Sequence, residues 1–246
     1  MGDNMDYDVS DVSDMSSLGE TWITQFCAKP RNQFFCEVSE LFVEEEFNLY
    51  GLSQVVPRYK EALELILDLE HESPVALADM PAINESGELL YGLIHARYII
   101  TRPGLLAMAQ KYKFNDFGTC PRVLCEDFGL LPMGRHDMPG YETVRLYCPC
   151  CRDIYMPSSP KFLGIDGAFF GSTFPGMMLD MMPEIEARLS QMRKLQFNLK
   201  IYGFKISPMS RSGARMRWLR ETPESEDFVP IDEDEGDDDD SDWFND

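Results

Sequence analysis

Five of the seven cysteines in this chain of 246 residues lie within one stretch of 32 residues. They include two pairs, Cys120 with Cys125 and Cys148 with Cys151, and 22 residues separate the pairs. Two tight turns that approach each other place four thiolates around one ion, which is the usual form of a tetrahedral zinc site. The sequence therefore predicts a zinc ribbon with one structural zinc per chain. Cys150 offers a competing thiolate, but the two-residue gap between Cys148 and Cys151 favours these two as ligands.

Disulfides are the competing interpretation of the cysteines, and they require an oxidising compartment. The N-terminus carries five aspartates before residue 15 and has no apolar stretch of the kind that a signal peptide needs. The longest uncharged run is the 13 residues between Asp166 and Asp180, whereas a membrane span needs about 20 apolar residues. We therefore expect reduced cysteines, no membrane association, and a location in the cytoplasm and nucleus.

The net charge of −21 is concentrated at the two ends of the chain. Residues 1–20 carry six acids and residues 221–246 carry fourteen, and neither segment has a lysine or arginine. Blocks of like charge repel one another and stay solvated, so both ends are expected to be disordered. The body between them is nearly neutral, which leaves a typical globular composition for residues 21–220.

Helical patterns dominate the first half of the body. The spacing of the apolar residues predicts helices near 22–26, 41–47, 53–69, 85–100 and 105–114, with Ser53 as an N-cap. Residues 143–147 alternate as a strand does, 161–180 show no clear period, 184–193 favour a further helix, and 197–206 favour a strand or hairpin.

We therefore expect an α+β fold, in which an all-helical N-terminal domain precedes a small four-cysteine zinc ribbon and an extended C-terminal segment. The expected regions are an acidic disordered leader (1–20), a helical domain (21–115), a zinc-ribbon dimerisation domain (116–172), a C-terminal docking segment (173–220) and an acidic disordered tail (221–246).

The chain shows no catalytic constellation. The triplet Asp-Phe-Gly occurs at 116–118 and 127–129, but the phosphate loop, strand lysine and catalytic loop of protein kinases are missing. No nucleophile is paired with a base, and His95 lies in a predicted helix, where a structural role is expected. With all four ligands from the protein, the zinc has no open position for a catalytic water. We expect a protein that is not an enzyme.

Nucleic-acid binding, which is common among zinc ribbons, needs clustered basic residues. Residues 116–160 have four arginines against six acids, so this surface is not suited to phosphates. The segment has more apolar residues than so small a module buries alone, which favours a homodimer interface. These residues are Val123, Leu124, Leu131, Met133, Val144 and Leu146.

Several stretches together resemble one known family, the regulatory (beta) subunit of casein kinase II. The resemblance runs through nearly all of residues 22–209. The stretches that carry it are Asn32-Gln-Phe-Phe-Cys-Glu-Val38, Phe47-Asn-Leu-Tyr-Gly-Leu52, Leu67-Asp-Leu-Glu70, Leu90-Tyr-Gly-Leu-Ile-His-Ala-Arg-Tyr-Ile99, Asp116-Phe-Gly-Thr-Cys-Pro-Arg-Val-Leu-Cys125, Leu146-Tyr-Cys-Pro-Cys-Cys151, Asp166-Gly-Ala-Phe-Phe-Gly171 and Tyr202-Gly-Phe-Lys-Ile206.

The resemblance implies a non-catalytic subunit that dimerises through its zinc ribbon and bridges two casein kinase II catalytic subunits. It implies docking to the kinase through Ile201, Tyr202 and Phe204. Because Tyr202 and Phe204 flank Gly203 in a strand-like segment, we expect both aromatics on one side of it. The resemblance also implies stabilisation of the kinase, a change in its choice of protein substrates, and serine phosphorylation near acids. Ser10, Ser13 and Ser225 are the candidates here, although none has an acid three residues later.

The chain departs from the family in two places: the segment after Glu70 is poor in acids, and the C-terminal tail is long and acidic. Two alternatives therefore stay open. One is a nucleic-acid-binding zinc-ribbon protein, and the other is a diverged scaffold that no longer binds a kinase.

Overall fold

The computed structural model of the chain describes residues 21–70, 76–192 and 200–205. The chain forms two units, with the division after Gln196. The candidate phosphorylation sites Ser10, Ser13 and Ser225, and both acidic ends, lie outside the described residues. No helix among the described residues combines the length and apolar character needed to cross a membrane.

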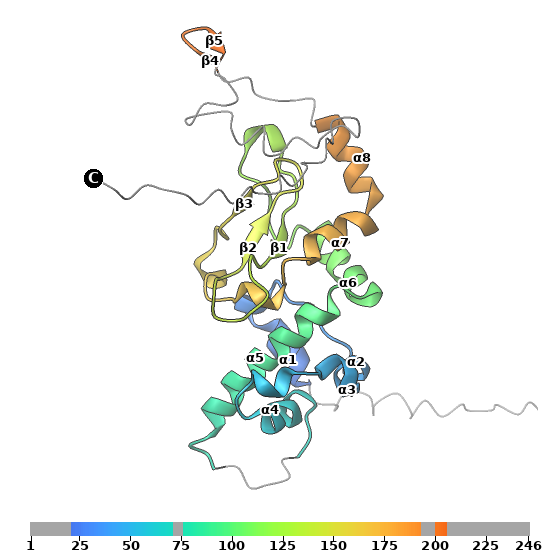
Figure 1. The fold of residues 1–246 in the computed structure, drawn as a ribbon, viewed down its shortest axis with the longest axis vertical. Coiled ribbons are helices and arrows are strands. Elements are labelled where there is room, and N and C mark those ends of the chain that lie inside the picture. Colours follow the sequence, from blue (N-terminus) through green and yellow to red (C-terminus); the bar gives the residue numbers. More distant parts are fainter. Residues whose placement is uncertain (1–20, 71–75, 193–199, 206–246) are drawn as a thin grey trace, which may run out of the picture. The chain divides into compact units, whose positions relative to one another are not determined.

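The first part of the chain is helical, as the apolar spacing predicts (Figure 1). Its elements are α1 (Trp22–Ala28), η1 (Pro30–Asn32), α2 (Glu40–Glu44), α3 (Glu46–Leu49), η2 (Leu52–Gln54), α4 (Tyr59–Ile66), α5 (Met80–Tyr98) and α6 (Arg102–Lys113). The α4 helix packs along α5, the longest of them.

Three helix boundaries differ from the sequence expectation, each because of a proline or a local backbone turn. Ser53 does not cap α4, since Pro57 disfavours helix in the residue before it and Arg58 takes a left-handed conformation at φ 47°. The α5 helix begins at Met80, before the expected residue 85, with a proline in its first turn, where no backbone N–H is needed. Arg102-Pro-Gly104 is likewise the first turn of α6, capped by Thr101, whose hydroxyl accepts the Gly104 N–H at 3.3 Å.

The next part is a small antiparallel sheet followed by two helices. The strand order is β1-β2-β3, with Leu131 opposite Tyr147 and Tyr147 opposite Ile154. Its elements are η3 (Val123–Cys125), β1 (Leu131–Met133), β2 (Arg145–Tyr147), β3 (Ile154–Tyr155), η4 (Pro160–Phe162), η5 (Gly167–Phe169), α7 (Phe174–Met181) and α8 (Pro183–Met192). Together with the four-cysteine cluster described below, this arrangement confirms the α+β prediction, although helices α7 and α8 occupy the start of the segment expected to be extended.

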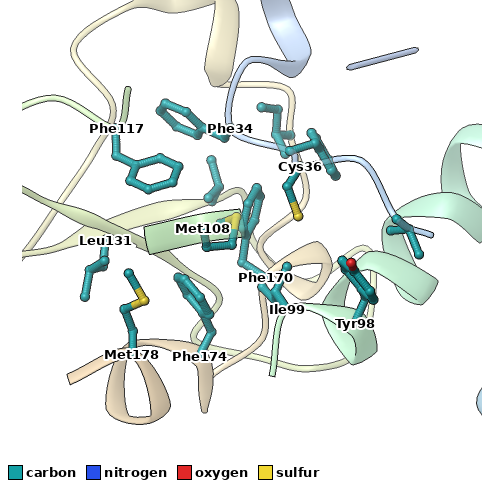
Figure 2. Packing of buried hydrophobic residues seen from close by; sticks show 14 of the residues in the cluster. Phe34, Cys36, Tyr98, Ile99, Met108, Phe117, Leu131, Phe170, Phe174 and Met178 are labelled. Atoms are coloured by element: carbon teal, nitrogen blue, oxygen red, sulfur yellow. The ribbon is translucent and has the colours of Figure 1, made fainter. Parts of the chain in front are cut away.

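The helical part and the ribbon share one hydrophobic core (Figure 2). Phe34, from the segment after α1, stacks on Phe162 with ring centroids 3.9 Å apart and meets Phe117 edge-on. On α5, a Cβ at Gly92 would lie 2.4 Å from the ring of Phe169, so only glycine lets this aromatic residue lie against the helix. Residues 161–172 show no hydrophobic periodicity in the sequence. Their aromatic side chains nevertheless pack on the helical part, so this segment joins the ribbon to the helical core.

The second unit contains the hairpin of β4 (Lys200–Ile201) and β5 (Phe204–Lys205), which the sequence predicts. Ile201 is opposite Phe204, and the two residues between them make the turn, with φ of 50° at Tyr202 and 85° at Gly203. Two consecutive residues with positive φ define a type I′ turn, which matches the twist of a hairpin. The expectation that Tyr202 and Phe204 lie on one side of a single strand is wrong, because the chain reverses between them.

Candidate metal centre

The four predicted ligands lie on two tight turns. The first turn precedes β1 in the sequence, and the second follows β2. In the first turn, the Cys120 N–H donates to the Phe128 carbonyl at 2.8 Å, and the Phe128 N–H donates to the Cys125 carbonyl at 3.0 Å. Glu126 and Asp127 take left-handed conformations between them. In the second turn, the Arg152 N–H donates to the Cys148 carbonyl at 2.8 Å, and Arg152 is again left-handed. These reversals turn both cysteine pairs back on themselves.

The turns bring Cys120, Cys125, Cys148 and Cys151 together, with all four sulfurs within 4.8 Å of one another. The Sγ atoms of Cys120 and Cys151 are 3.9 Å apart. Sulfurs about 2.3 Å from a tetrahedral zinc lie about 3.8 Å from each other, so this spacing suits the ion. Three of the four residues are buried and Cys151 is partly buried. The cluster can thus hold a metal away from water with no ligand position left open.

The sulfurs of the cluster are close enough to shift one another's pKa values. Hydrogen bonds from neighbouring thiols, Cys148 first, lower the pKa of Cys151 below its ordinary value. The same hydrogen bond, together with burial, raises the pKa of Cys148 well above its ordinary value. The Tyr155 hydroxyl lies 3.1 Å from the Cys151 sulfur and supports the charge from outside the cluster. In a four-thiolate site a divalent cation would take the place of these protons and stabilise all four thiolates.

Cys150 lies beside the cluster and outside it. It is partly buried, and it contacts the Cys125 thiol through a hydrogen bond. It is not among the four residues whose sulfurs converge. Tyr155, which no sequence motif singles out, is the outer partner of the cluster. It lies on β3, a strand of two residues that is too short to recognise by alternation.

The six apolar residues predicted to form an interface divide into three groups: three are buried, two are exposed and one, Met133, is half-buried. Leu131, Val144 and Leu146 are buried in the chain's own core, which is larger than the ribbon alone because the helical part contributes to it. For these three residues, the prediction that the ribbon has more apolar side chains than the chain can bury is wrong. Val123 is 89% exposed and Leu124 is also exposed. Two further apolar residues of the ribbon, Ile154 and Met156, are exposed as well.

Three of the ribbon's four arginines are engaged with its own carboxylates. Arg122 pairs with Asp153, and Arg135 and Arg145 both pair with Glu142. A phosphate would have to compete with these partners. The described part of the ribbon therefore gives nucleic-acid binding no support.

The predicted docking residues lie on the hairpin of the second unit with their side chains in solvent. Tyr202 is 97% exposed, Phe204 is 79% exposed and Ile201 is more than half exposed. Large exposed aromatics on a hairpin are typical of a protein-binding surface.

Comparison with known proteins decides the family. A family model described as casein kinase II regulatory subunit matches residues 21–205. The chain belongs to the casein kinase II regulatory subunit family. It is 46% identical over 236 residues to the casein kinase II subunit beta of Candida albicans, covering 83% of this chain and 80% of that protein. It is 41% identical over 255 residues to the Saccharomyces cerevisiae subunit beta, covering 90% and 92% of the two chains.

A third relative, the subunit beta-2 of Schizosaccharomyces pombe, is 48% identical over 200 residues, covering 81% of this chain and 79% of that protein. The family and these relatives are named as regulatory or beta subunits and not as catalytic subunits. The resemblance drawn from the sequence motifs is thereby confirmed, and so is the assignment to a class of protein that regulates a kinase without being one.

Proposed function

We propose that this chain is the non-catalytic subunit of a casein kinase II holoenzyme, in which it dimerises through a zinc ribbon and bridges two catalytic subunits. In this role it stabilises the catalytic subunits and alters which protein substrates they phosphorylate. The family match over residues 21–205 carries the proposal. The decisive experiment mixes the purified chain with a casein kinase II catalytic subunit and measures the mass of the complex and its kinase activity.

The proposed metal is one zinc ion held by Cys120, Cys125, Cys148 and Cys151. Its support is the convergence of four sulfurs at the spacing that zinc requires. When bound, the ion neutralises thiolate charge and ties the two turns together. The ligands are the chain's own, so the metal is structural and takes no part in phosphoryl transfer.

Dimerisation through the ribbon is expected to depend on both the metal and the exposed apolar residues. Val123→Asp with Ile154→Asp places two charges among these residues, and burying either charge in an interface without a partner is costly. We expect this variant to keep its zinc and to sediment as a monomer at micromolar concentration. Chelation of zinc from the unaltered chain should also convert dimer to monomer. A zinc-loaded, unaltered chain that sediments as a monomer would rule out the dimer.

Kinase docking is expected to depend on the aromatic hairpin. Truncation of buried interface aromatics typically costs about 2 kcal/mol or more, which corresponds to about a 30-fold loss of affinity. We expect Tyr202→Ala with Phe204→Ala to weaken binding to the catalytic subunit by about 30-fold or more, measured by calorimetry. Zinc content and dimerisation should be retained, since the hairpin lies in a separate unit. Unchanged affinity would exclude the hairpin as the anchor.

A further inference from the structure

Two aromatic side chains stand in solvent on the helical part of the chain, remote in sequence from the hairpin. Phe47 in α3 and Tyr50, the residue that caps it, are each 84% exposed. They are three residues apart, and the Tyr50 N–H donates to the Phe47 carbonyl at 3.4 Å, so one turn of backbone joins them. Neither belongs to the hydrophobic core or to the metal centre.

The backbone under this pair is fixed by hydrogen bonds. From α5, Arg97 donates to the carbonyl of Asn48 at 2.6 Å and to the carbonyl of Tyr50 at 2.9 Å. The Asn48 amide donates to the Phe42 carbonyl in α2 at 3.0 Å, and Leu49 is buried. The aromatic pair is thus held outward by a rigid corner and is not exposed through fraying. A surface ordered in advance loses little entropy when it binds.

The chain segment that carries the pair is acidic, and Arg97 is the basic residue that reaches it from α5. Residues 32–57 contain no lysine, arginine or histidine and five acids, all of them exposed: Glu37, Glu40, Glu44, Glu45 and Glu46. None of the ion pairs among the described residues involves these carboxylates. Their charge therefore remains available to a partner.

A hollow of about 440 Å³ adjoins the start of this segment. The residues that line it include Thr21, Thr24, Glu37, Ser39, Glu40 and Leu41. The two carboxylates and three hydroxyls suit the charged end of a lysine or arginine. The apolar side chain of Leu41 suits its aliphatic stem, since such side chains commonly lay their methylenes along apolar surface.

We propose that this acidic aromatic face, defined by Glu37, Glu40, Leu41, Phe47 and Tyr50, docks a short basic segment of a partner protein. The segment combines lysine or arginine with large aliphatic side chains. A basic side chain enters the hollow, and the aliphatic side chains cover the aromatic pair. The hollow and the pair are within about 20 Å of each other along two short helices, a span that about six extended residues cover.

The charge of the face selects among classes of partner. Nucleic acids and anionic membranes present phosphates, which five exposed carboxylates repel. An uncharged apolar partner would leave the carboxylates desolvated without compensation. A basic segment of a protein satisfies both the charge and the aromatic surface. This docking is independent of the kinase contact proposed above, which rests on the hairpin.

The test uses the full, zinc-loaded chain and a fluorescein-labelled peptide of sequence KRLLKRLK, with binding measured by fluorescence anisotropy at physiological salt. Phe47→Ala with Tyr50→Ala should weaken binding by about tenfold or more, as expected when two anchoring aromatics are lost. Glu37→Gln with Glu40→Gln should weaken it by about fivefold or more, because two charge-assisted contacts are lost. The Glu37→Gln with Glu40→Gln variant tests how much charge contributes to binding at the same face, because it alters no apolar residue.

Matched variants elsewhere control for the loss of aromatic area and of charge. Leu77→Ala with Phe114→Ala removes two comparably exposed apolar side chains, and Glu85→Gln with Glu184→Gln removes two exposed charges. Each should change binding by less than about twofold, as exposed substitutions away from a site do. If the aromatic variant binds as tightly as its control, attraction to the acidic ends explains the binding and the proposal is overturned.

A second peptide and the kinase separate the remaining explanations. A peptide with serine in place of each leucine should bind about tenfold more weakly, and equal binding would show a purely electrostatic attraction and reject the aromatic anchor. Phe47→Ala with Tyr50→Ala should leave affinity for the catalytic subunit unchanged, whereas Tyr202→Ala with Phe204→Ala should leave peptide binding unchanged. Loss of both activities in either variant would contradict two independent surfaces.

Discussion

Replacement of Cys120 by serine is expected to remove the metal and unfold the ribbon. Structural zinc contributes about 10–16 kcal/mol to the folding of small zinc modules, which is comparable to the whole stability of a typical domain, about 5–15 kcal/mol. Removal of a residue that only hydrogen-bonds to a metal ligand typically weakens metal binding by about 10–100-fold. Removal of a ligand itself should weaken metal binding more. The zinc content of Cys120→Ser, measured by mass spectrometry of the metal, should fall from one per chain to nearly none.

The loss should extend beyond the ribbon, because Phe128 and Leu131 beside the metal centre belong to the core shared with the helical part. We expect a lowered melting temperature for the whole first unit. Cys150→Ser is the matched control, since Cys150 is a neighbouring thiol outside the group of four converging sulfurs. It should keep its zinc and its melting temperature. Equal loss of metal in the two variants would show that the ligand assignment is wrong.

Substitution of His95 is expected to change how stability depends on pH. His95 is fully buried in α5. The Cys36 N–H donates to its Nε2 at 3.2 Å, so this nitrogen is an acceptor, and its Nδ1–H donates to the Phe169 carbonyl at 2.8 Å. If the imidazole were doubly protonated, its Nε2–H would point at the Cys36 N–H, and two donors would face each other without an acceptor. Burial lowers the pKa of His95 from 6.5 to about 4, in agreement with this geometry.

The direction of the pH effect follows from the lowered pKa. Between pH 6.5 and pH 4 the unfolded chain binds a proton at His95 that the folded chain does not bind. Stability from this residue is therefore complete above pH 6.5 and falls as the pH is lowered toward 4. The loss between pH 7 and pH 5 is about 2 kcal/mol, since each unit of pKa difference corresponds to about 1.4 kcal/mol.

His95→Gln keeps an amide donor and a carbonyl acceptor but does not titrate. We expect it to lower the free energy of unfolding at pH 7 by about 1–3 kcal/mol, because its hydrogen bonds to Cys36 and Phe169 fit less well. Between pH 7 and pH 5 it should lose about 2 kcal/mol less than the unaltered chain in urea unfolding. The control is His136→Gln, at an exposed position, which should behave as the unaltered chain does. Identical pH dependence of His95→Gln and the unaltered chain would contradict a neutral, buried His95.

The metal centre is the part of the molecule that the sequence predicts most completely. Four cysteines at knuckle spacing are sufficient, because metal coordination is a local requirement and each turn supplies two ligands with few intervening residues. The structure brings together the same four residues and leaves Cys150 outside the group. What the sequence does not supply is the outer partner, Tyr155, since its approach to Cys151 depends on strand pairing.

The helices of the first part were also accessible from sequence, because apolar residues at helical spacing mark α1, α4, α5 and α6. The residues at which these helices begin were harder to predict. A proline such as Pro81 is usually taken to end a helix, although the first helical turn accepts it. The α7 helix was missed for the same reason, with Pro175 and Gly176 among its first residues.

The sequence by itself determined which four cysteines converge, the helical character of the first part and the family, each of which depends on residues close together in the chain or on whole motifs. Only the tertiary structure decided how the ribbon and the helical part combine. Phe162 and Phe169 meet residues of distant segments, Phe34 and Gly92, by stacking and close approach, and such contacts leave no period in the sequence. The same packing buries Leu131 and Val144 inside the chain, because the core that receives them is built from both parts and is larger than the ribbon alone.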